Sequence, residues 1–428
     1  MKDSTTIRTG PVPIEQSAKL AKEASRRLAT LSSATKNRLL NDLAESLASD
    51  PVIDAVIAAN STDMQAARAA ELPPARLARL ELTRGSVLRL AEGVRQIASL
   101  PDPIGETTRD SILPNGLRVR KVRAPIGVIA MVYEARPGVT IDAFALCFKA
   151  GNACILKGGR EAARSNDALA ATVHRVLRDH GLPEASLYSA SGMARDELRE
   201  LLTLNQSIDL VIPRGGRELI EFVVGHSTIP TIQHFHGVCH IFVDESADIP
   251  SAIEICATAK CGMPAACNAV ECILVHKNIA DRLVPPLIER LVREGVEVRG
   301  TPLVLALAGE KRITLAEACD FGREFLDLVV AMRVVDSLDE AIDHIATYGS
   351  NHTESILTLN RSSAERFTQA VQSSCVLVNA STRFNDGFSL GLGAEIGIST
   401  SRIHAYGPMG LEELTTQRWI VEGDGHWR

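Results

Sequence analysis

Short apolar runs rich in β-branched residues alternate with helical segments over most of this chain. From residue 127 the runs "GVIAMVYEA", "NACILKGG" and "IDLVIP" are separated by helical patterns such as "SNDALAATVHRVLRDHG". A second series starts near residue 248, with "AVECILVH", "LVVAMRVVD", "SILTLN" and "SCVLVNAS" as its expected strands. Buried strands that alternate with helices indicate parallel sheets covered on both faces. We therefore predict an α/β protein with two doubly wound parallel-sheet domains.

Two segments do not follow this rhythm. Residues 14–100 have the apolar spacing of helices, and "GLRVRKVRAPIG" alternates apolar and basic residues after the turn signal "LPNG". Such alternation predicts an amphipathic strand or hairpin that lies outside a buried parallel sheet.

The composition narrows the class of protein. With 428 residues, 45% hydrophobic and 23% charged, the chain is typical of a folded protein of two or three domains. Its 46 basic and 52 acidic residues (net charge −6) favour neither a nucleic-acid surface nor a polybasic membrane anchor. The N-terminal stretch has no apolar signal segment, and the apolar runs are far shorter than the ~20 residues of a spanning helix. We expect a cytoplasmic protein without a membrane segment.

Two strand ends carry a cation followed by two glycines. Lys157-Gly158-Gly159 follows "ACIL", and Arg214-Gly215-Gly216 follows "DLVIP" and opens a helical pattern. Glycine lets a backbone approach a ligand closely, and a helix N-terminus offers free N–H groups to a phosphate. Each motif alone is as well explained by a tight turn, but the two together favour a dinucleotide site. The glycine-rich "GLGAEIG" at 391–397 follows no strand and is interpreted as a loop.

Nine cysteines raise the question of a nucleophile. An odd number without a CxxC pair fits a reducing compartment, and with no HExxH we expect no metal site. Most of the cysteines lie in apolar segments and are expected to be packed in a core. Cys267 lies among small residues in "PAACNAV", before a possible helical turn that would promote thiolate character, and Cys261 is its competitor in the same region. Composition favours Cys267 only modestly.

Several stretches together resemble a known family. "PIGVIAMVYEARPGVTIDAF", "AGNACILKGG", "LVIPRGG", "CNAVECILVH", "YGSNHTESILT" and "GPMGLEELTT" are similar to the gamma-glutamyl phosphate reductase family, a branch of the aldehyde dehydrogenase superfamily. The resemblance extends from about residue 15 to residue 419. It implies an aldehyde-dehydrogenase-like fold and an NADPH-dependent reduction of L-glutamyl 5-phosphate in proline biosynthesis.

The resemblance also implies roles for individual residues. The superfamily's nucleophile aligns with Cys267, its adenosine-ribose lysine with Lys157, and its nicotinamide-ribose glutamate with Glu324. The substrate would be held by Arg136, Asn268, His352 and Thr353, although a structural ion pair is an open alternative for Arg136.

Two departures from the superfamily pattern matter. Its water-activating glutamate is replaced by His234 in "HFHG", which suits an enzyme that reduces its thioester instead of hydrolysing it. Its oxyanion asparagine has no secure counterpart. The alternatives are an ordinary NAD(P)-dependent aldehyde dehydrogenase, against which the missing glutamate argues, and a non-catalytic scaffold, against which the retained Cys267 and the two glycine turns argue.

The expected domains follow from the motifs and the resemblance. We assign residues 1–109 and 126–245 to a cofactor-binding domain, 246–410 to a catalytic domain, and 110–125 with 411–428 to an oligomerisation element. A homodimer or homotetramer is expected because an unpaired strand would expose a hydrogen-bonding edge. The open alternative is that the two segments of the oligomerisation element pair only with each other as a flap. Association with glutamate 5-kinase is a further possibility that the resemblance raises.

Overall fold

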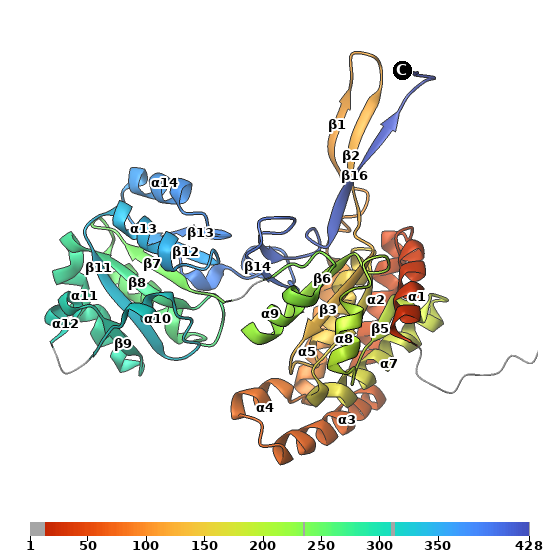
Figure 1. Ribbon diagram of the computed structural model, residues 1–428, viewed down its shortest axis with the longest axis horizontal. Helices are drawn as coiled ribbons and strands as arrows, with labels where there is room; N and C mark the ends of the chain where they lie inside the picture. Colours follow the sequence, from red (N-terminus) through yellow and green to blue (C-terminus); the bar gives the residue numbers. More distant parts are fainter. Residues whose placement is uncertain (1–12, 234–235, 310–312, 428) are drawn as a thin grey trace, which may run out of the picture. The chain divides into compact units, whose positions relative to one another are not determined.

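The computed structural model describes residues 13–233, 236–309 and 313–427, which form two compact units (Figure 1). In sequence, the first unit runs to Gln233 and resumes at Gly410, and the second unit is formed by the residues from 234 to 409. We expected the first domain to extend to residue 245. The boundary falls earlier because β7 (Cys239–Val243) is hydrogen-bonded between β8 and β12 of the second unit's sheet.

The first unit is built around a four-stranded parallel sheet in the order β5-β4-β3-β6. Every residue of β3 is buried, as its continuous apolar run requires. The strands and the helices that alternate with them are β3 (Val128–Tyr133), α6 (Val139–Lys149), β4 (Ala153–Lys157), η1 (Arg160–Ala162), α7 (Ala163–Asp179), η2 (Glu184–Ser186), β5 (Leu187–Ser189), α8 (Arg195–Leu201), β6 (Leu210–Arg214) and α9 (Arg217–His226).

Between residues 13 and 127, five helices precede this sheet, in agreement with the helical spacing of residues 14–100. They are α1 (Ile14–Leu28), α2 (Ser33–Ala48), α3 (Asp50–Ala69), α4 (Pro74–Leu80) and α5 (Arg84–Ser99). The apolar stripe of α2 is completely buried at Leu39, Leu40 and Leu43, and the Ser32 side chain caps this helix by accepting from Thr35 N.

The basic alternating segment forms a separate antiparallel sheet in the order β1-β2-β16, which projects from the first unit (Figure 1). Its strands are β1 (Thr107–Ile112), β2 (Arg118–Pro125) and β16 (Thr415–Glu422). Only Val122 and Ala124 of β2 and Thr415 of β16 are buried, so most of both faces is exposed. The predicted amphipathic hairpin is present, and the C-terminal segment completes it as a third strand.

The second unit has a seven-stranded parallel sheet in the order β10-β9-β11-β8-β7-β12-β13. Side chains alternate between two cores, so that Ile241 and Val243 join one cluster and Phe242 joins the other. Besides β7, its strands are β8 (Val270–His276), β9 (Glu297–Gly300), β10 (Thr314–Leu315), β11 (Val329–Val335), β12 (Thr353–Leu357) and β13 (Cys375–Val378).

Helices cover this second sheet, and one short hairpin follows it. The helices are α10 (Ile249–Cys261), α11 (Lys277–Arg293), α12 (Pro302–Ala308), η3 (Ala318–Gly322), α13 (Leu338–Tyr348), α14 (Arg361–Ala370) and η4 (Thr382–Phe384), and the hairpin is β14 (Gly397–Ser399) with β15 (Gly407–Met409). Among the described residues, no helix has the length and apolarity needed to cross a membrane.

Candidate active site

Cys267 lies at the amino edge of the second unit's sheet. It occupies a turn three residues before β8, and the first residues of β7 and β12 are Cys239 and Thr353. Parallel strands begin at a common edge, which brings these residues together. The helical turn expected after Cys267 is absent, because the chain passes from the turn directly into the strand.

The backbone around Cys267 is held by close neighbours. A Cβ added to Gly237 would lie 2.0 Å from the carbonyl oxygen of Cys267, so only glycine permits this approach. The Cys239 thiol donates to the same carbonyl oxygen at 3.2 Å, and its sulfur lies 3.5 Å from Nδ1 of His352. Cys267 itself is half-buried. Its loop is therefore fixed while its side chain keeps some exposure.

Asn268, the next residue, closes a ring of hydrogen bonds around this turn. Its side-chain Nδ2 donates to the carbonyl oxygen of Asn385 at 3.0 Å. Nδ2 of Asn385 in turn donates to Oγ1 of Thr353 at 2.6 Å, and that oxygen lies 2.6 Å from Nδ1 of His352. Asn268, His352 and Thr353 are all buried, so in this structure each helps to position the Cys267 turn.

Glu324 lies in the loop before β11 and contacts this arrangement through Gly237. Its Oε1 accepts a hydrogen bond from Gly237 N at 2.9 Å, and burial raises the pKa of the Glu324 carboxyl. The glutamate thus supports the backbone that packs against Cys267. The nicotinamide-ribose contact implied by the resemblance stays a prediction.

A buried ion pair lies next to the Glu324 loop. Nζ of Lys260 lies 2.6 Å from Oε2 of Glu271, and both side chains are at most 1% exposed. Oε1 of Glu271 also accepts from Leu326 N at 3.4 Å. Burial raises the pKa of Glu271 to about 7, although the adjacent Lys260 ammonium opposes the rise. The pair joins α10, β8 and the Glu324 loop.

The competitor Cys261 is placed differently. It is the last residue of α10, where the partial negative charge of the helix end disfavours a thiolate. Burial, and then the nearby Glu294 carboxylate, raise the pKa of its thiol. These surroundings disfavour Cys261 as a nucleophile.

In the first unit, the predicted cofactor residues lie at the carboxyl edge of the sheet. The strand order β5-β4-β3-β6 reverses direction between β3 and β6, and ligands of open α/β sheets bind at such a switch point. Lys157 and Arg214 end β4 and β6 at this edge. Arg136 follows β3 and is exposed. These sequence-predicted residues therefore share one edge.

The Gly215-Gly216 turn has a partner that the sequence did not reveal. Gly216 N donates to Oε2 of Glu134, the residue after β3, at 3.0 Å. A Cβ on Gly215 would lie 2.7 Å from the Leu219 side chain and 2.8 Å from Cδ of Glu134. Neither glycine has a positive φ, so the turn requires a close approach and not a left-handed backbone. A phosphate at this amide would have to displace the Glu134 carboxylate.

The turn after Lys157 is also closely packed. A Cβ on Gly158 would lie 2.1 Å from Nδ2 of Asn166, and one on Gly159 would lie 2.3 Å from Oε1 of Glu161. Lys157 is half-buried, and burial lowers the pKa of its ammonium. The lysine is therefore held at the edge with part of its side chain accessible.

Several residues of the two sites were not predicted. Cys239, Asn385 and Glu134 contribute contacts, yet none belongs to a local motif that marks it in the sequence. His234, expected in place of the superfamily's glutamate, lies outside the described residues.

Comparison with known proteins identifies relatives across nearly the whole chain. The profile of the aldehyde dehydrogenase family matches residues 6–298. A gamma-glutamyl phosphate reductase of Xylella fastidiosa is 50% identical over 97% of this chain and 99% of its own length. One from Xanthomonas axonopodis is 49% identical over 95% of this chain and 97% of its own. The crystal structure of the Thermotoga maritima gamma-glutamyl phosphate reductase superposes with a TM-score of 0.95 at 39% identity, covering 97% of this chain and all of the other.

Proposed function

The chain belongs to the aldehyde dehydrogenase family and, within it, to the gamma-glutamyl phosphate reductases, and from this we propose that it reduces L-glutamyl 5-phosphate to L-glutamate 5-semialdehyde and phosphate. The observation that carries the proposal is Cys267, half-buried on a turn that a ring of hydrogen bonds holds in place. The reaction would serve proline biosynthesis.

The proposed mechanism is covalent, with Cys267 as the nucleophile. Its thiolate attacks the acyl carbon, a C–S bond forms, and the C–O bond to phosphate breaks. Hydride addition to the resulting thioester gives a tetrahedral oxyanion. As that oxyanion re-forms a C=O bond, the C–S bond breaks, which releases the aldehyde and restores the thiolate. Arg136 is our candidate for the substrate phosphate, and the backbone N–H of Cys267 is the candidate donor to the oxyanion.

The residues at the carboxyl edge of the first sheet fit a nicotinamide dinucleotide. The edge combines a switch point with the Lys157 ammonium, whereas the glycines at 158 and 215 are required by close packing against Asn166 and Glu134. When bound, the reduced cofactor supplies the hydride. We propose NADPH because Arg160 begins η1, three residues after Lys157, and an arginine near the adenosine ribose favours a 2′-phosphate.

A coupled assay in the oxidative direction tests the function. With glutamate 5-semialdehyde and NADP⁺, we expect NADPH formation that depends completely on inorganic phosphate, because the thioester is released only by phosphate. Cys267→Ala should remove turnover while NADPH binding, followed by fluorescence, persists. The matched control Cys261→Ala should retain activity.

The alternative, an ordinary aldehyde dehydrogenase, differs in one measurable respect. Its thioester is hydrolysed by water, so NADPH would form without phosphate. Phosphate-independent turnover, or an inactive Cys261→Ala with an active Cys267→Ala, would refute the proposed mechanism.

We also propose that the β1-β2-β16 sheet mediates a homodimer or homotetramer. In the part of the chain that the structure describes, no strand pairs with the outer edge of β1 or of β16, and Trp419 and Val421 of β16 are more than half exposed. β2 and β16 already pair with each other within one chain, so the sheet would associate through its faces or its two edges. Association with glutamate 5-kinase and the cytoplasmic location stay predictions.

A further inference from the structure

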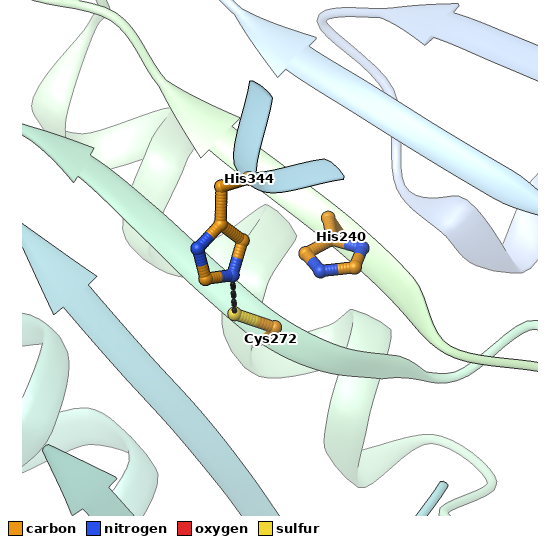
Figure 2. A group of neighbouring side chains, drawn as sticks. All are labelled: His240, Cys272 and His344. Atoms are coloured by element: carbon orange, nitrogen blue, oxygen red, sulfur yellow. Dashed lines mark hydrogen bonds between the residues drawn. The ribbon is translucent and has the colours of Figure 1, made fainter. Parts of the chain in front are cut away.

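A second group of reactive side chains lies inside the second unit, beside the Cys267 turn. His240 of β7 and Cys272 of β8 are paired in register, and Glu354 of β12 is paired with His240 on the other side. His344 of α13 covers this part of the sheet (Figure 2). All four side chains are buried. The proposed reaction uses none of them.

The spacing of the donor atoms suits a metal ion. His240, Cys272 and His344 each offer one atom, and the three atoms lie within 4.8 Å of one another. Sγ of Cys272 is 3.7 Å from Nε2 of His344 (Figure 2). Zinc bonds of about 2.3 Å to sulfur and about 2.0 Å to nitrogen, at a tetrahedral angle, would separate such atoms by roughly 3.5 Å. Only small side-chain movements are needed to enclose an ion.

The hydrogen bonds of His240 point to an absent partner. Its Nδ1 lies 3.1 Å from Oε2 of Glu354, which also accepts from His240 N at 2.7 Å. In a neutral ring this contact places the imidazole proton on Nδ1 and the lone pair on Nε2. Although burial opposes it, the Glu354 carboxylate raises the pKa of His240 to about 10, so a metal ion at Nε2 has to displace a proton. Within the described residues Nε2 makes no hydrogen bond, although the side chain is completely buried. Metal-binding histidines commonly donate their other ring N–H to a carboxylate, which fixes the orientation of the ring.

A contact of His344 also opposes metal binding. Nη1 of Arg333 lies 3.3 Å from Nδ1 of His344, and a metal on Nε2 would require a proton on that Nδ1. Arg333 is also bound to Glu340 at 2.6 Å, and a third of its side chain is exposed. It can therefore turn away from His344 and keep its carboxylate partner. The rival arrangement is a metal-free chain in which both imidazoles contact the Cys272 sulfur.

We propose that His240, Cys272 and His344 form a structural site for a thiophilic transition-metal ion, Zn²⁺ or Cu⁺. Zn²⁺ and Cu⁺ bind imidazole and thiolate ligands well, whereas hard cations prefer oxygen ligands. Cu⁺ can be held by the three side chains alone, whereas Zn²⁺ requires a water as fourth ligand. The ion would join β7, β8 and α13. Such a site was not expected from the sequence because its ligands come from three separate elements.

Metal binding is measured on the full chain, independently of catalysis. Accessible thiols are first alkylated with iodoacetamide, which removes the exposed and half-buried cysteines as competitors. Zn²⁺ or Cu⁺ is then added, both to native protein and during refolding, because the site is buried. We expect one equivalent retained after dialysis and a melting temperature raised by roughly 5–10 °C at a hundredfold excess over Kd. Co²⁺ should give a near-ultraviolet thiolate-to-metal charge-transfer band.

Three variants distinguish the proposed site from other metal-binding groups. Cys272→Ala should lose the charge-transfer band and the thermal shift, whereas Cys256→Ala, which removes another buried cysteine of the same unit, should keep both. His344→Gln should weaken retention at least tenfold, since one of three ligands is lost. Retention of less than one-tenth of an equivalent under both conditions, or a band that survives in Cys272→Ala, would overturn the proposal.

Discussion

Replacing Lys260 with methionine should strongly destabilise the second unit. At 2.6 Å and an effective dielectric constant of about 20, the attraction between Lys260 and Glu271 is roughly 6 kcal/mol, which offsets the cost of burying two charges. Removing one partner leaves the other buried and uncompensated. We expect the free energy of unfolding to fall by about 3–5 kcal/mol at pH 8.

The pH dependence gives this prediction a definite sign. The pKa of Glu271 is raised in the folded state to about 7, from an ordinary value of 4.5, so its stabilising contribution is present at low pH and is lost as the pH rises through 7. Without the Lys260 ammonium the pKa rises further. The deficit of Lys260→Met relative to the unaltered chain should therefore shrink as the pH falls from 8 to 5.

Urea unfolding followed by circular dichroism at several pH values measures the deficit. Lys260→Met/Glu271→Leu should recover most of the stability, because apolar residues commonly replace a buried pair without loss. Lys277→Met, which removes an exposed pair with Asp336, is the matched control and should have no measurable effect. A deficit below about 1 kcal/mol, or one that grows toward acid pH, would refute the reasoning.

Three further perturbations have defined outcomes. Gly215→Val should raise the KM for NADPH, because the new side chain collides with Glu134. The control Gly216→Ala, whose Cβ would lie 3.9 Å from the nearest atom, Oε2 of Glu134, should leave that KM unchanged. Equal KM values for the two variants would favour a plain turn. Asn60→Leu should lower the free energy of unfolding by about 2–4 kcal/mol in urea titrations, because the buried amide makes hydrogen bonds to Leu80 O, Leu82 N and Ser165 Oγ; a loss below 1 kcal/mol would contradict this. Trp419→Glu/Val421→Glu places charges on the exposed face of β16 and should dissociate the proposed oligomer in light scattering, and an unchanged mass would exclude this face as the interface.

The architecture was largely predictable because it depends on periodic patterns. The continuous apolar runs around Val128 and Val270 became completely buried central strands, and the alternating segment before Pro125 became the exposed hairpin. The domain boundary was misplaced because "CHIFV" has the same composition whichever sheet it joins. Only the strands with which this segment pairs, β8 and β12, show that it belongs to the second unit's sheet.

The site was predictable to a smaller extent. Cys267 was singled out by its small neighbours and by family resemblance, and the structure places it at the amino edge of its sheet. Ligands of open α/β sheets usually lie at the opposite edge, so strand patterns alone would have directed attention elsewhere. Contacts such as Cys239 to Cys267 join residues far apart in sequence, and no local signal marks them.

The pairing of β2 with β16 also sets an order of events during synthesis. β2 ends at Pro125 and β16 begins at Thr415, so the ribosome makes the whole second unit between the two strands. At translation rates of 5–20 residues per second, the intervening roughly 290 residues take about 15–60 s. During that time a nascent β1-β2 hairpin has no third strand. In the hairpin Arg118 pairs with Asp110 and Arg123 with Glu106, whereas the ion-pair partner of Arg120 is Glu422 of β16. Until β16 arrives, the charges of Arg120 and the adjacent Lys121 would keep neighbouring nascent chains on one polysome from joining at this edge.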